Sequence, residues 1–186
     1  MDVDYGGSFT ATGVPTIPGG VSRVDLQTQI KFPTIVGVGY GLRLNDNVRL
    51  SADLEWLQFS RFQSLILQVP ASLPGLATTI PQNWRDTFTL GGGVDWKLDS
   101  NWTARASYQF FQTPVPSYTF SPLIPDSNQN VASVGLEWHS GHHRLAGAYA
   151  YVSYADRNIT SNQNPAYVGR YEISVHLISL NYGYTF

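Results

Sequence analysis

The sequence predicts an all-β protein, namely a transmembrane antiparallel up-and-down β-barrel. Three observations predict it: apolar and polar residues alternate with a period of two, short and long connections alternate, and the chain is 13% aromatic but only 13% charged. Soluble domains usually carry about 25% charged residues. With 186 residues, the chain is expected to form one domain over residues 1–186. The absence of cysteine excludes a disulfide scaffold, and a net charge of -2 gives no reason to expect nucleic acid as a partner.

The longest alternation runs from Ser22 to Leu44. Its even-numbered positions are almost all apolar, whereas its odd-numbered positions are mostly polar residues or glycine. The parity does not change at Pro33, so we expect one long strand rather than a tight hairpin. Proline has no N–H to donate, and Pro33 should therefore lie at a bend or at a locally unpaired position.

The same alternation recurs along the chain and predicts about eight strands. They cover residues 2–12, 22–44, 48–62, 84–98, 101–112, 129–139, 143–155 and 169–186. The orientation of the strand over residues 143–155 stays open, because both of its faces are apolar. An even number of strands places both chain ends on the periplasmic side, where the short connections are also expected.

Alternation alone fits two architectures, because a soluble lipocalin-like barrel also has one apolar face per strand. The connections favour the membrane barrel, whose periplasmic turns are short and whose extracellular loops are long. The short connections are 45–47, 99–101 and 140–142, and the long ones are 13–21, 63–83, 113–128 and 156–169. No apolar run approaches the roughly 20 residues of a transmembrane helix, so strands are expected to cross the lipid.

The aromatic residues favour the same architecture. Many of them fall near strand ends, where membrane barrels carry interfacial girdles: Trp56, Phe59, Trp84, Phe88, Trp96, Trp102, Phe110, Phe111 and Trp138. The last strand ends at Phe186, preceded at steps of two by Tyr184, Tyr182, Leu180 and Ile178. This ending resembles the signal that the outer-membrane assembly machinery recognises, so that machinery is an expected partner through Phe186. The bacterial outer membrane is the expected location, with membrane lipid around the barrel.

Several local motifs follow one another along the chain. They are Phe32-Pro33, Asp53-Leu54-Glu55-Trp56, the segment from Phe59 to Leu65, Trp84-Arg85-Asp86, Gly91-Gly92-Gly93, Thr113-Pro114-Val115-Pro116 with Ile124-Pro125-Asp126, and the segment from Asn181 to Phe186. In this order and spacing they resemble the C-terminal half of the outer-membrane long-chain fatty acid transporter family, the FadL- and TodX-like proteins. The Thr-Pro-Val-Pro and Pro-Asp pair is the most specific part of the resemblance.

The resemblance implies a barrel of about fourteen strands, plugged by an N-terminal hatch, that passes hydrophobic compounds across the outer membrane. Nothing in this chain resembles the hatch or the first strands. The domain is therefore expected to be either the C-terminal part of a longer transporter barrel or a smaller barrel of its own. The expected function is passive diffusion of long-chain fatty acids or aromatic hydrocarbons, with no enzyme activity and no cofactor. The alternatives are a structural or surface-interaction barrel without transport activity and a soluble lipocalin-like binder.

Candidate substrate contacts come from two regions. The connection from Phe62 to Asn83 is apolar for a surface segment, so it either receives hydrophobic small molecules or packs on neighbouring loops. The charges on the expected inner face either pair with one another or, at Lys31 or Arg105, meet a fatty acid carboxylate. The candidate substrate-binding residues are Lys31, Phe59, Phe62, Leu65, Leu67, Arg105 and Phe111.

Other clusters give no sign of catalysis or of a metal site. Asp53 and Glu55 share the expected inner face, but no nucleophile or oxyanion-stabilising group accompanies them. His139, His142 and His143 surround a short turn without the carboxylates or cysteines that complete a metal site, so a polar turn is expected. Neither catalytic residues nor metal ligands are therefore predicted.

Overall fold

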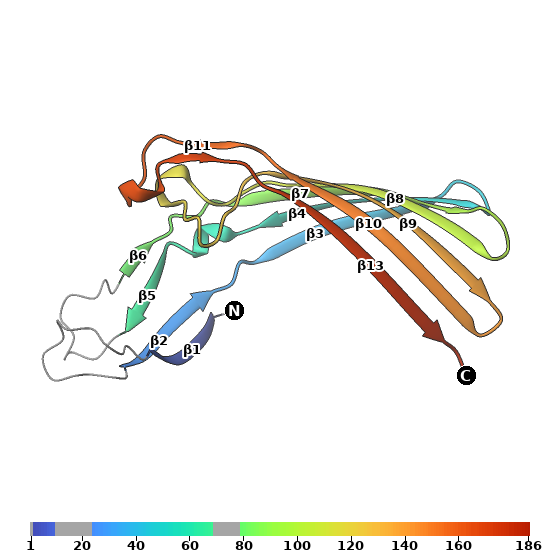
Figure 1. Cartoon of the computed structure of the whole chain (residues 1–186), viewed down its shortest axis with the longest axis horizontal. Coiled ribbons are helices and arrows are strands. Elements are labelled where there is room, and N and C mark those ends of the chain that lie inside the picture. Colours follow the sequence, from blue (N-terminus) through green and yellow to red (C-terminus); the bar gives the residue numbers. More distant parts are fainter. Residues whose placement is uncertain (1, 10–23, 69–78) are drawn as a thin grey trace, which may run out of the picture.

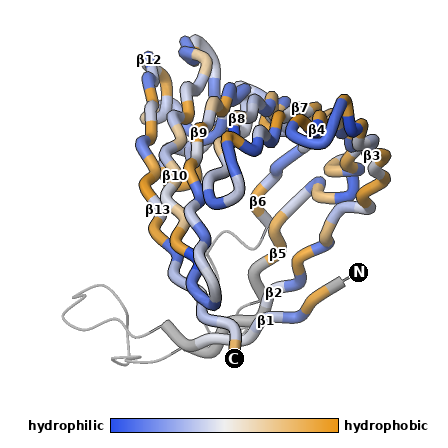
Figure 2. The backbone as a smooth tube through the Cα atoms, turned by 90° about the vertical axis from the view of Figure 1, so that its right-hand side faces the viewer, coloured by the Kyte–Doolittle hydropathy of each residue, from blue (hydrophilic) through white to orange (hydrophobic). Residues whose placement is uncertain are grey.

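The computed structural model describes residues 2–9, 24–68 and 79–186, which form an all-β structure, as predicted. Its main part is a seven-stranded antiparallel sheet with the order β13-β10-β9-β8-β7-β4-β3. Its strands are β3 (Ile35–Arg43), β4 (Val48–Leu57), β7 (Thr87–Lys97), β8 (Trp102–Phe111), β9 (Gln129–Ser140), β10 (His143–Tyr154) and β13 (Ser174–Tyr184). Figure 2 shows the sheet as an arc around an open interior, with β13 and β3 at its two edges.

A four-stranded sheet with the order β1-β2-β5-β6 follows on from β3 through the connection between β2 and β3. Its strands are β1 (Asp2–Phe9), β2 (Val24–Lys31), β5 (Ser64–Gln68) and β6 (Thr79–Pro81). The remaining elements are the hairpin of β11 (Arg157–Ile159) and β12 (Gly169–Tyr171) and the 3₁₀ helices η1 (Phe59–Arg61), η2 (Ser117–Thr119) and η3 (Pro165–Tyr167). Within the described ranges, no helix has the length and apolar character needed to cross a membrane.

The short turns gather at one end of the molecule and the long connections at the other (Figure 1). The side chains of Asn45 and Asp99 shape two of the turns, because each accepts hydrogen bonds from two following backbone amides at 2.7–2.9 Å. Gly141 supplies the positive φ of 55° that the third turn requires. The predicted alternation of short and long connections is confirmed where the chain is described, and the expected connection 13–21 lies outside the described residues.

The outer face of the sheet is apolar and carries aromatic residues at two levels. Trp56 lies directly opposite Phe88 in the ladder, and Trp102 lies directly opposite Trp138. Phe88 and Trp96 are eight residues apart on β7, or about 26 Å along the strand at about 3.3 Å per residue. Strands of membrane barrels tilt by about 35–45°, so this corresponds to about 20 Å across the membrane, close to the height of about 25 Å of the apolar band between two aromatic girdles. The spacing of the aromatic residues therefore fits a lipid-facing wall, and Figure 2 shows the underlying alternation of hydrophobic and hydrophilic residues along the strands.

The prediction of one continuous strand over residues 22–44 is wrong, because the strand is interrupted at residues 32–34 and its halves, β2 and β3, belong to different sheets. Pro33 offers no N–H for a ladder, as predicted for a locally unpaired position. Next to it, Thr34 O accepts a hydrogen bond from Gln58 N, the residue that follows β4, at 2.8 Å. Beyond this contact the segment after β4 turns into η1, so it separates from the strand that leads to β2.

The prediction of about eight strands is too low, since the structure describes thirteen. The additional strands come mainly from the short hairpins β5–β6 and β11–β12, which lie within the long connections. The C-terminus lies at the end with the short turns, as predicted (Figure 1). The other chain end does not, because Asp2 pairs with Lys31 beside the strand break. The parts of predicted elements within residues 10–23 and 69–78 lie outside the described residues.

The edge strands β3 and β13 do not pair with each other, so the described strands form an open section of a barrel wall. We expect the isolated 186-residue chain, refolded in detergent, to give no faster-migrating band on a gel when unboiled, because an open sheet leaves two edges unpaired. A closed outer-membrane barrel on the same gel is the positive control. A band that shifts on boiling would show instead that this chain closes its own barrel.

Candidate functional site

The end of the molecule with the long connections contains an apolar cavity of about 750 Å³. Its walls come from the end of β2, the η1 turn, the β5–β6 hairpin, segment 113–128 and the β11–β12 connection. Leu123 and Ile124 also line the cavity, although the two residues are 83% and 73% exposed. Exposed apolar residues beside an apolar cavity are typical of a site that binds hydrophobic molecules.

An aromatic cluster forms one wall of this apolar cavity. The ring centroids of Phe59 and Phe62 lie 5.5 and 4.9 Å from that of Trp84, at interplanar angles of 69° and 76°. Edge-to-face contacts of this kind stabilise the cluster beyond the effect of burial alone. Two backbone contacts fix its geometry: Phe62 N donates to Phe59 O at 2.9 Å, and Ser60 N donates to Asp86 Oδ1 at 2.9 Å. The prediction that Phe59 and Trp84 belong to an interfacial girdle is therefore wrong, because both line the cavity.

Segment 113–128, the proline-rich segment, forms another wall, although it contains four prolines and no strand. Its two ends are joined side by side. Thr113 Oγ1 donates to Asp126 Oδ2 at 2.6 Å, and Thr113 N donates to Asn128 Oδ1 at 2.9 Å. These contacts give a physical reason for the Thr-Pro-Val-Pro and Pro-Asp motifs, since the threonine of one motif bonds the aspartate of the other.

The β11–β12 hairpin holds the proline-rich segment through Arg157. Arg157 Nη1 donates to Asp126 O at 2.9 Å, and its Nη2 donates to Val115 O at 2.9 Å and to Ser117 Oγ at 3.1 Å. The guanidinium carbon also lies 5.0 Å from the ring centroid of Phe120. Burial lowers the pKa of Arg157 from its usual value, and Asp126 partly offsets this effect, but an arginine remains charged in proteins. Hydrogen bonds to charged groups stabilise by about 1.5–3 kcal/mol each.

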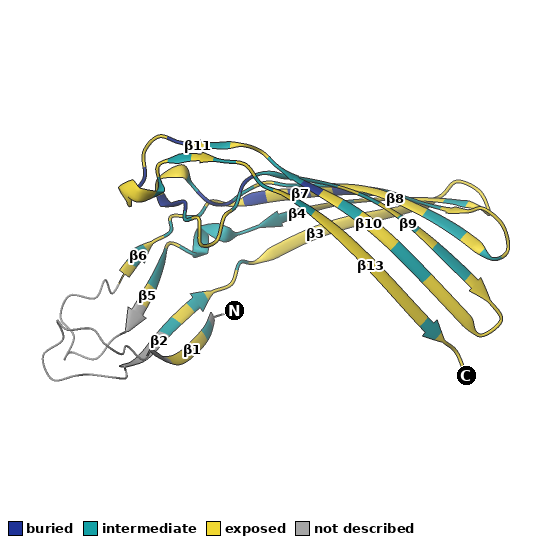
Figure 3. Ribbon diagram, viewed as in Figure 1, coloured by how far each residue is buried: buried dark blue, intermediate teal, exposed yellow. Residues whose placement is uncertain are grey.

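A small buried core lies beneath these contacts, and Figure 3 shows buried residues gathered at this end of the molecule. Asn162 Nδ2 donates to Ser117 O at 3.0 Å and to Phe120 O at 2.8 Å, so it satisfies two carbonyls of the proline-rich segment. The core consists of three buried apolar residues and two partly buried aromatic residues, namely Val115, Phe120 and Ile159 with Trp84 and Tyr171. The loops around the cavity are therefore packed on one another.

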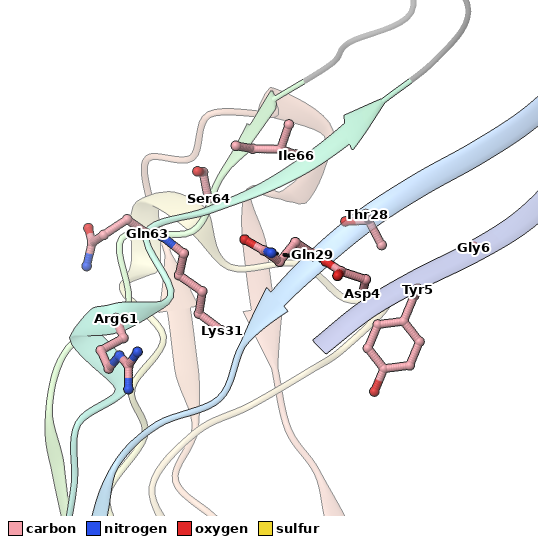
Figure 4. A pocket seen from close by; sticks show the side chains of 10 residues that line it. All are labelled: Asp4, Tyr5, Gly6, Thr28, Gln29, Lys31, Arg61, Gln63, Ser64 and Ile66. Carbon is pink, nitrogen blue, oxygen red and sulfur yellow. Dashed lines mark hydrogen bonds between the residues drawn. The ribbon is translucent and has the colours of Figure 1, made fainter. Parts of the chain in front are cut away.

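A second cavity, of about 520 Å³, lies between β1, β2 and β5 and is lined mostly by polar residues. Figure 4 shows the side chains of Lys31, Gln63 and Ser64 around the gap between β2 and β5. On the adjacent strands, Gln29 Nε2 donates to Asp4 Oδ1 at 3.0 Å. Lys31 also lines the apolar cavity, so it marks the place where the polar cavity meets the apolar one.

The inner face of the large sheet carries a network of alternating charges away from both cavities. Arg105 Nε lies 3.2 Å from Asp95 Oδ1, and Arg105 Nη1 lies 2.8 Å from Glu137 Oε2. Arg144 Nη2 approaches the same Glu137 oxygen at 2.6 Å. Four neighbouring strands, β7 to β10, are therefore linked by two acids and two bases whose formal charges cancel.

The structure brings four of the seven predicted site residues together. Lys31, Phe59, Phe62 and Leu65 all line the apolar cavity. Arg105 does not belong to it, because this residue pairs with acids on the inner face. Two candidates remain. The backbone of Leu67 pairs with Thr28, but its side chain lies outside the described ones, whereas Phe111 ends β8 opposite Thr89 and does not line the cavity.

Sequence reasoning missed several residues that shape the site. Trp84, Tyr167, Leu123 and Ile124 line the apolar cavity, and Arg157 holds one of its walls. One signal for the loop residues is visible in the sequence, since Leu123-Ile124 is an apolar pair between two prolines in a long connection. Arg157 gives no such signal, because most of its partners are backbone carbonyls.

Together, the apolar outer face and the charged inner face define part of an outer-membrane barrel that carries an apolar cavity among its long connections. A family model described as outer membrane protein transport protein (OMPP1/FadL/TodX) matches residues 2–186. The chain belongs to this family, and the bacterial outer membrane is its location, as predicted from the sequence.

Two curated relatives place the chain within longer proteins. It is 27% identical over 175 residues to an outer-membrane protein of Neisseria meningitidis serogroup B, a match that covers 86% of this chain and 38% of the relative. It is 24% identical over 174 residues to the long-chain fatty acid transport protein of Escherichia coli, covering 93% of this chain and 38% of that protein. The chain thus spans about two fifths of the length of these relatives.

Solved structures of the same family share the fold. A Pseudomonas aeruginosa FadL homologue superimposes with a TM-score of 0.76 at 24% identity, over 90% of this chain and 40% of that one. The Pseudomonas putida toluene transporter TodX gives a TM-score of 0.61 at 14% identity, over 100% of this chain and 42% of that one. These likenesses confirm the predicted barrel fold, and the family model confirms the predicted family resemblance.

We predict that Glu137→Gln destabilises the intact barrel without changing its affinity for hydrophobic ligands. The substitution removes the shared partner of Arg105 and Arg144, and the Glu137 side chain is only 13% exposed. The two arginines are more exposed, so we expect a loss of about 1–2 kcal/mol rather than the full cost of breaking a buried pair. The measurement is the temperature at which the unboiled gel band is lost.

The matched control for this prediction is Glu172→Gln, which removes an exposed partner of Arg170 in the β11–β12 hairpin region. This change should leave the temperature of band loss unaltered. A ligand affinity that falls with Glu137→Gln would contradict the assignment of the inner-face network to the barrel wall alone.

Proposed function

We propose that this chain forms part of a barrel that transports hydrophobic compounds across the outer membrane by passive diffusion. The observation that carries the proposal is the apolar cavity of about 750 Å³ among the long connections. The similarity to a long-chain fatty acid transport protein and to a toluene transporter supports the same class of cargo. Diffusion down a gradient requires neither a cofactor nor an energy source, and we propose transport rather than catalysis.

In the proposed mechanism, the exposed rim captures the molecule first. Leu123 and Ile124 offer apolar surface to the solvent, and the aromatic cluster offers more within the cavity. Each methylene group that leaves water stabilises the complex by about 0.8 kcal/mol, so a long alkyl chain is held without any specific polar contact. The molecule then leaves the cavity for the barrel interior, because weak, non-directional contacts allow release.

Lys31 is the proposed contact for an acidic head group. It lies where the polar and the apolar cavities meet, so an alkyl chain can occupy the apolar side while a carboxylate remains on the polar side. A charge-assisted hydrogen bond between an ammonium and a carboxylate is stronger than a neutral one. Arg105 is less suited to this role, because Asp95 and Glu137 already occupy its guanidinium.

Membrane lipid and the outer-membrane assembly machinery are the proposed partners of the barrel wall. Lipid covers the apolar outer face between the aromatic levels. The assembly machinery reads the end of β13, where the terminal Phe186 is fully exposed and its ring lies 5.3 Å from that of Tyr184. The competing proposal of a structural or surface-interaction barrel rests on the same exposed Leu123-Ile124 tip, and the first experiment below separates the two.

We predict that Phe62→Ala in the intact protein raises the half-saturation concentration for a fluorescent long-chain fatty acid about tenfold, or about 1.4 kcal/mol. The substitution removes a ring from the cavity wall and its contact with Trp84. Phe111→Ala is the matched control, because it removes the same side chain from a position outside the cavity. If neither wild type nor variant binds saturably, the barrel is structural; if Phe111→Ala has the larger effect, the cavity is not the binding site.

We also predict that Lys31→Met weakens binding of oleate about 10- to 100-fold, as expected for the loss of a hydrogen bond between charged groups. Binding of toluene, which has no acidic group, should remain unchanged. Lys97→Met is the control, because it removes a lysine from the end of β7 near the short turns. Equal losses for oleate and toluene would show that Lys31 only shapes the cavity.

A further inference from the structure

We infer that Arg157 is a positioning residue for the apolar cavity: it holds the proline-rich segment in the conformation in which that segment forms a cavity wall. The inference rests on the proposed function of the cavity. It goes further by assigning the geometry of the site to a side chain that does not line it. Val115, Thr119, Leu123 and Ile124 are the wall residues that depend on this arrangement.

The first argument is the position of the acceptors. Val115 and Asp126 lie near opposite ends of the proline-rich segment, and their carbonyl oxygens both accept hydrogen bonds from Arg157 at 2.9 Å. One guanidinium group therefore bridges two distant carbonyls of the segment, in addition to the contacts of Thr113 with Asp126 and Asn128, and restricts the path of the residues between them. A lysine has a single ammonium and cannot reproduce this planar, two-nitrogen contact.

The second argument is that the proline-rich segment has few backbone hydrogen bonds of its own. Four of its residues are prolines without an N–H, and apart from the three-residue η2 it contains no regular element. Several of its carbonyl groups therefore accept hydrogen bonds from donors outside the segment. Arg157 and Asn162, both from the β11–β12 region, supply the donors for four of them, those of Val115, Ser117, Phe120 and Asp126.

The third argument is the contrast with Arg170, which lies on the partner strand β12. Arg170 is exposed, and the partners of its side chain among the described residues are acidic side chains of its own region, at 2.9 Å to Asp156 and 2.6 Å to Glu172. Arg157 and Arg170 belong to one hairpin and occupy adjacent pairs of its ladder. Their side chains nevertheless have different partners. Of the two, Arg157 contacts the proline-rich segment, whereas the described contacts of Arg170 are with acidic side chains.

The functional consequence is preorganisation. A wall that is already ordered does not have to be ordered when the ligand binds, so the ligand keeps more of its binding free energy. Without Arg157, the strands of the barrel remain, but the segment samples conformations in which Leu123 and Ile124 no longer line the cavity. Affinity then falls while the number of binding sites per folded barrel stays the same.

The experiment uses the folded barrel that contains this chain, in detergent, with Val115→Cys as the reporter and the same protein without Val115→Cys as the labelling blank. This chain contains no cysteine, and Val115 is 7% exposed, so a cysteine there reacts slowly with a maleimide while the segment is held. Arg157→Met should raise the labelling rate at least tenfold, and Arg157→Lys should give an intermediate rate. Arg170→Met, the matched control, should leave the rate unchanged. An unchanged rate with Arg157→Met overturns the inference.

The same Arg157 variants, without the reporter cysteine, are then titrated with a fluorescent long-chain fatty acid. Arg157→Met should raise the half-saturation concentration about tenfold at unchanged stoichiometry, whereas a folding defect lowers the stoichiometry. If labelling rises but affinity does not, Arg157 holds the loop without positioning the site, and the inference fails. If Arg157→Met does not fold, Asn162→Ala and Arg157→Lys carry the test. If wild type binds no fatty acid, the proposed function fails, and the labelling rates still decide whether Arg157 holds the segment.

Discussion

Backbone pairing is the constraint on which the rest of this structure depends. A strand that crosses lipid must find a partner for every N–H and C=O, because no water is available there. The ladder between β3 and β4 meets this requirement from Arg43 to Ile35. The ladder stops near Pro33, which has no N–H to donate, and there the two segments of the chain separate. The apolar cavity begins at this separation, since Lys31, Phe32 and Pro33 line it on one side and Phe59 and Phe62 on the other.

Beyond the ladder, side chains take over the pairing of the backbone. Asn162 and Arg157 donate to carbonyls of the proline-rich segment, and Thr119 Oγ1 donates to Gln82 O at 2.5 Å. Such contacts cross between connections that are far apart in the sequence, so the loops stabilise one another as a unit. This arrangement allows irregular backbone to border a cavity while these carbonyls keep hydrogen-bond donors. Backbone ladders therefore satisfy the polar groups of the sheet, whereas side chains satisfy many of those in the loops. The cavity lies where the sheet meets the loops.

This difference between backbone pairing in the sheet and side-chain contacts in the loops explains what could be predicted from the sequence. Strands with one lipid-facing side show a period of two, so β4, β8, β9 and β10 were predictable to within a few residues. The break at Pro33 was not, because the parity of apolar residues continues unchanged from β2 into β3. A period of two records which face a residue occupies, but it does not record whether the neighbouring strand is still paired.

The candidate site was predictable only in part, for a related reason. Phe59, Phe62 and Leu65 lie close together in the sequence, so an apolar loop already indicated them. Trp84 was assigned to an interfacial girdle instead of the cavity wall, because aromatic residues suit both positions equally well. The role of Arg157 could not be predicted, because it donates mainly to backbone carbonyls, and every residue type has one. Contacts of side chains with backbone depend on the path of the chain, which only the tertiary structure gives.

The charged residues of the barrel wall and of the cavity also differ in how they are paired. On the inner face, the formal charges of Asp95, Arg105, Glu137 and Arg144 cancel one another, so this network carries no net charge. A ligand carboxylate that approached Arg105 would have to displace an acid already bonded at 2.8 Å. At the cavity junction, by contrast, no ion pair joins Lys31 to another described side chain. We therefore propose the junction, rather than the inner wall, as the place where an acidic head group would be recognised.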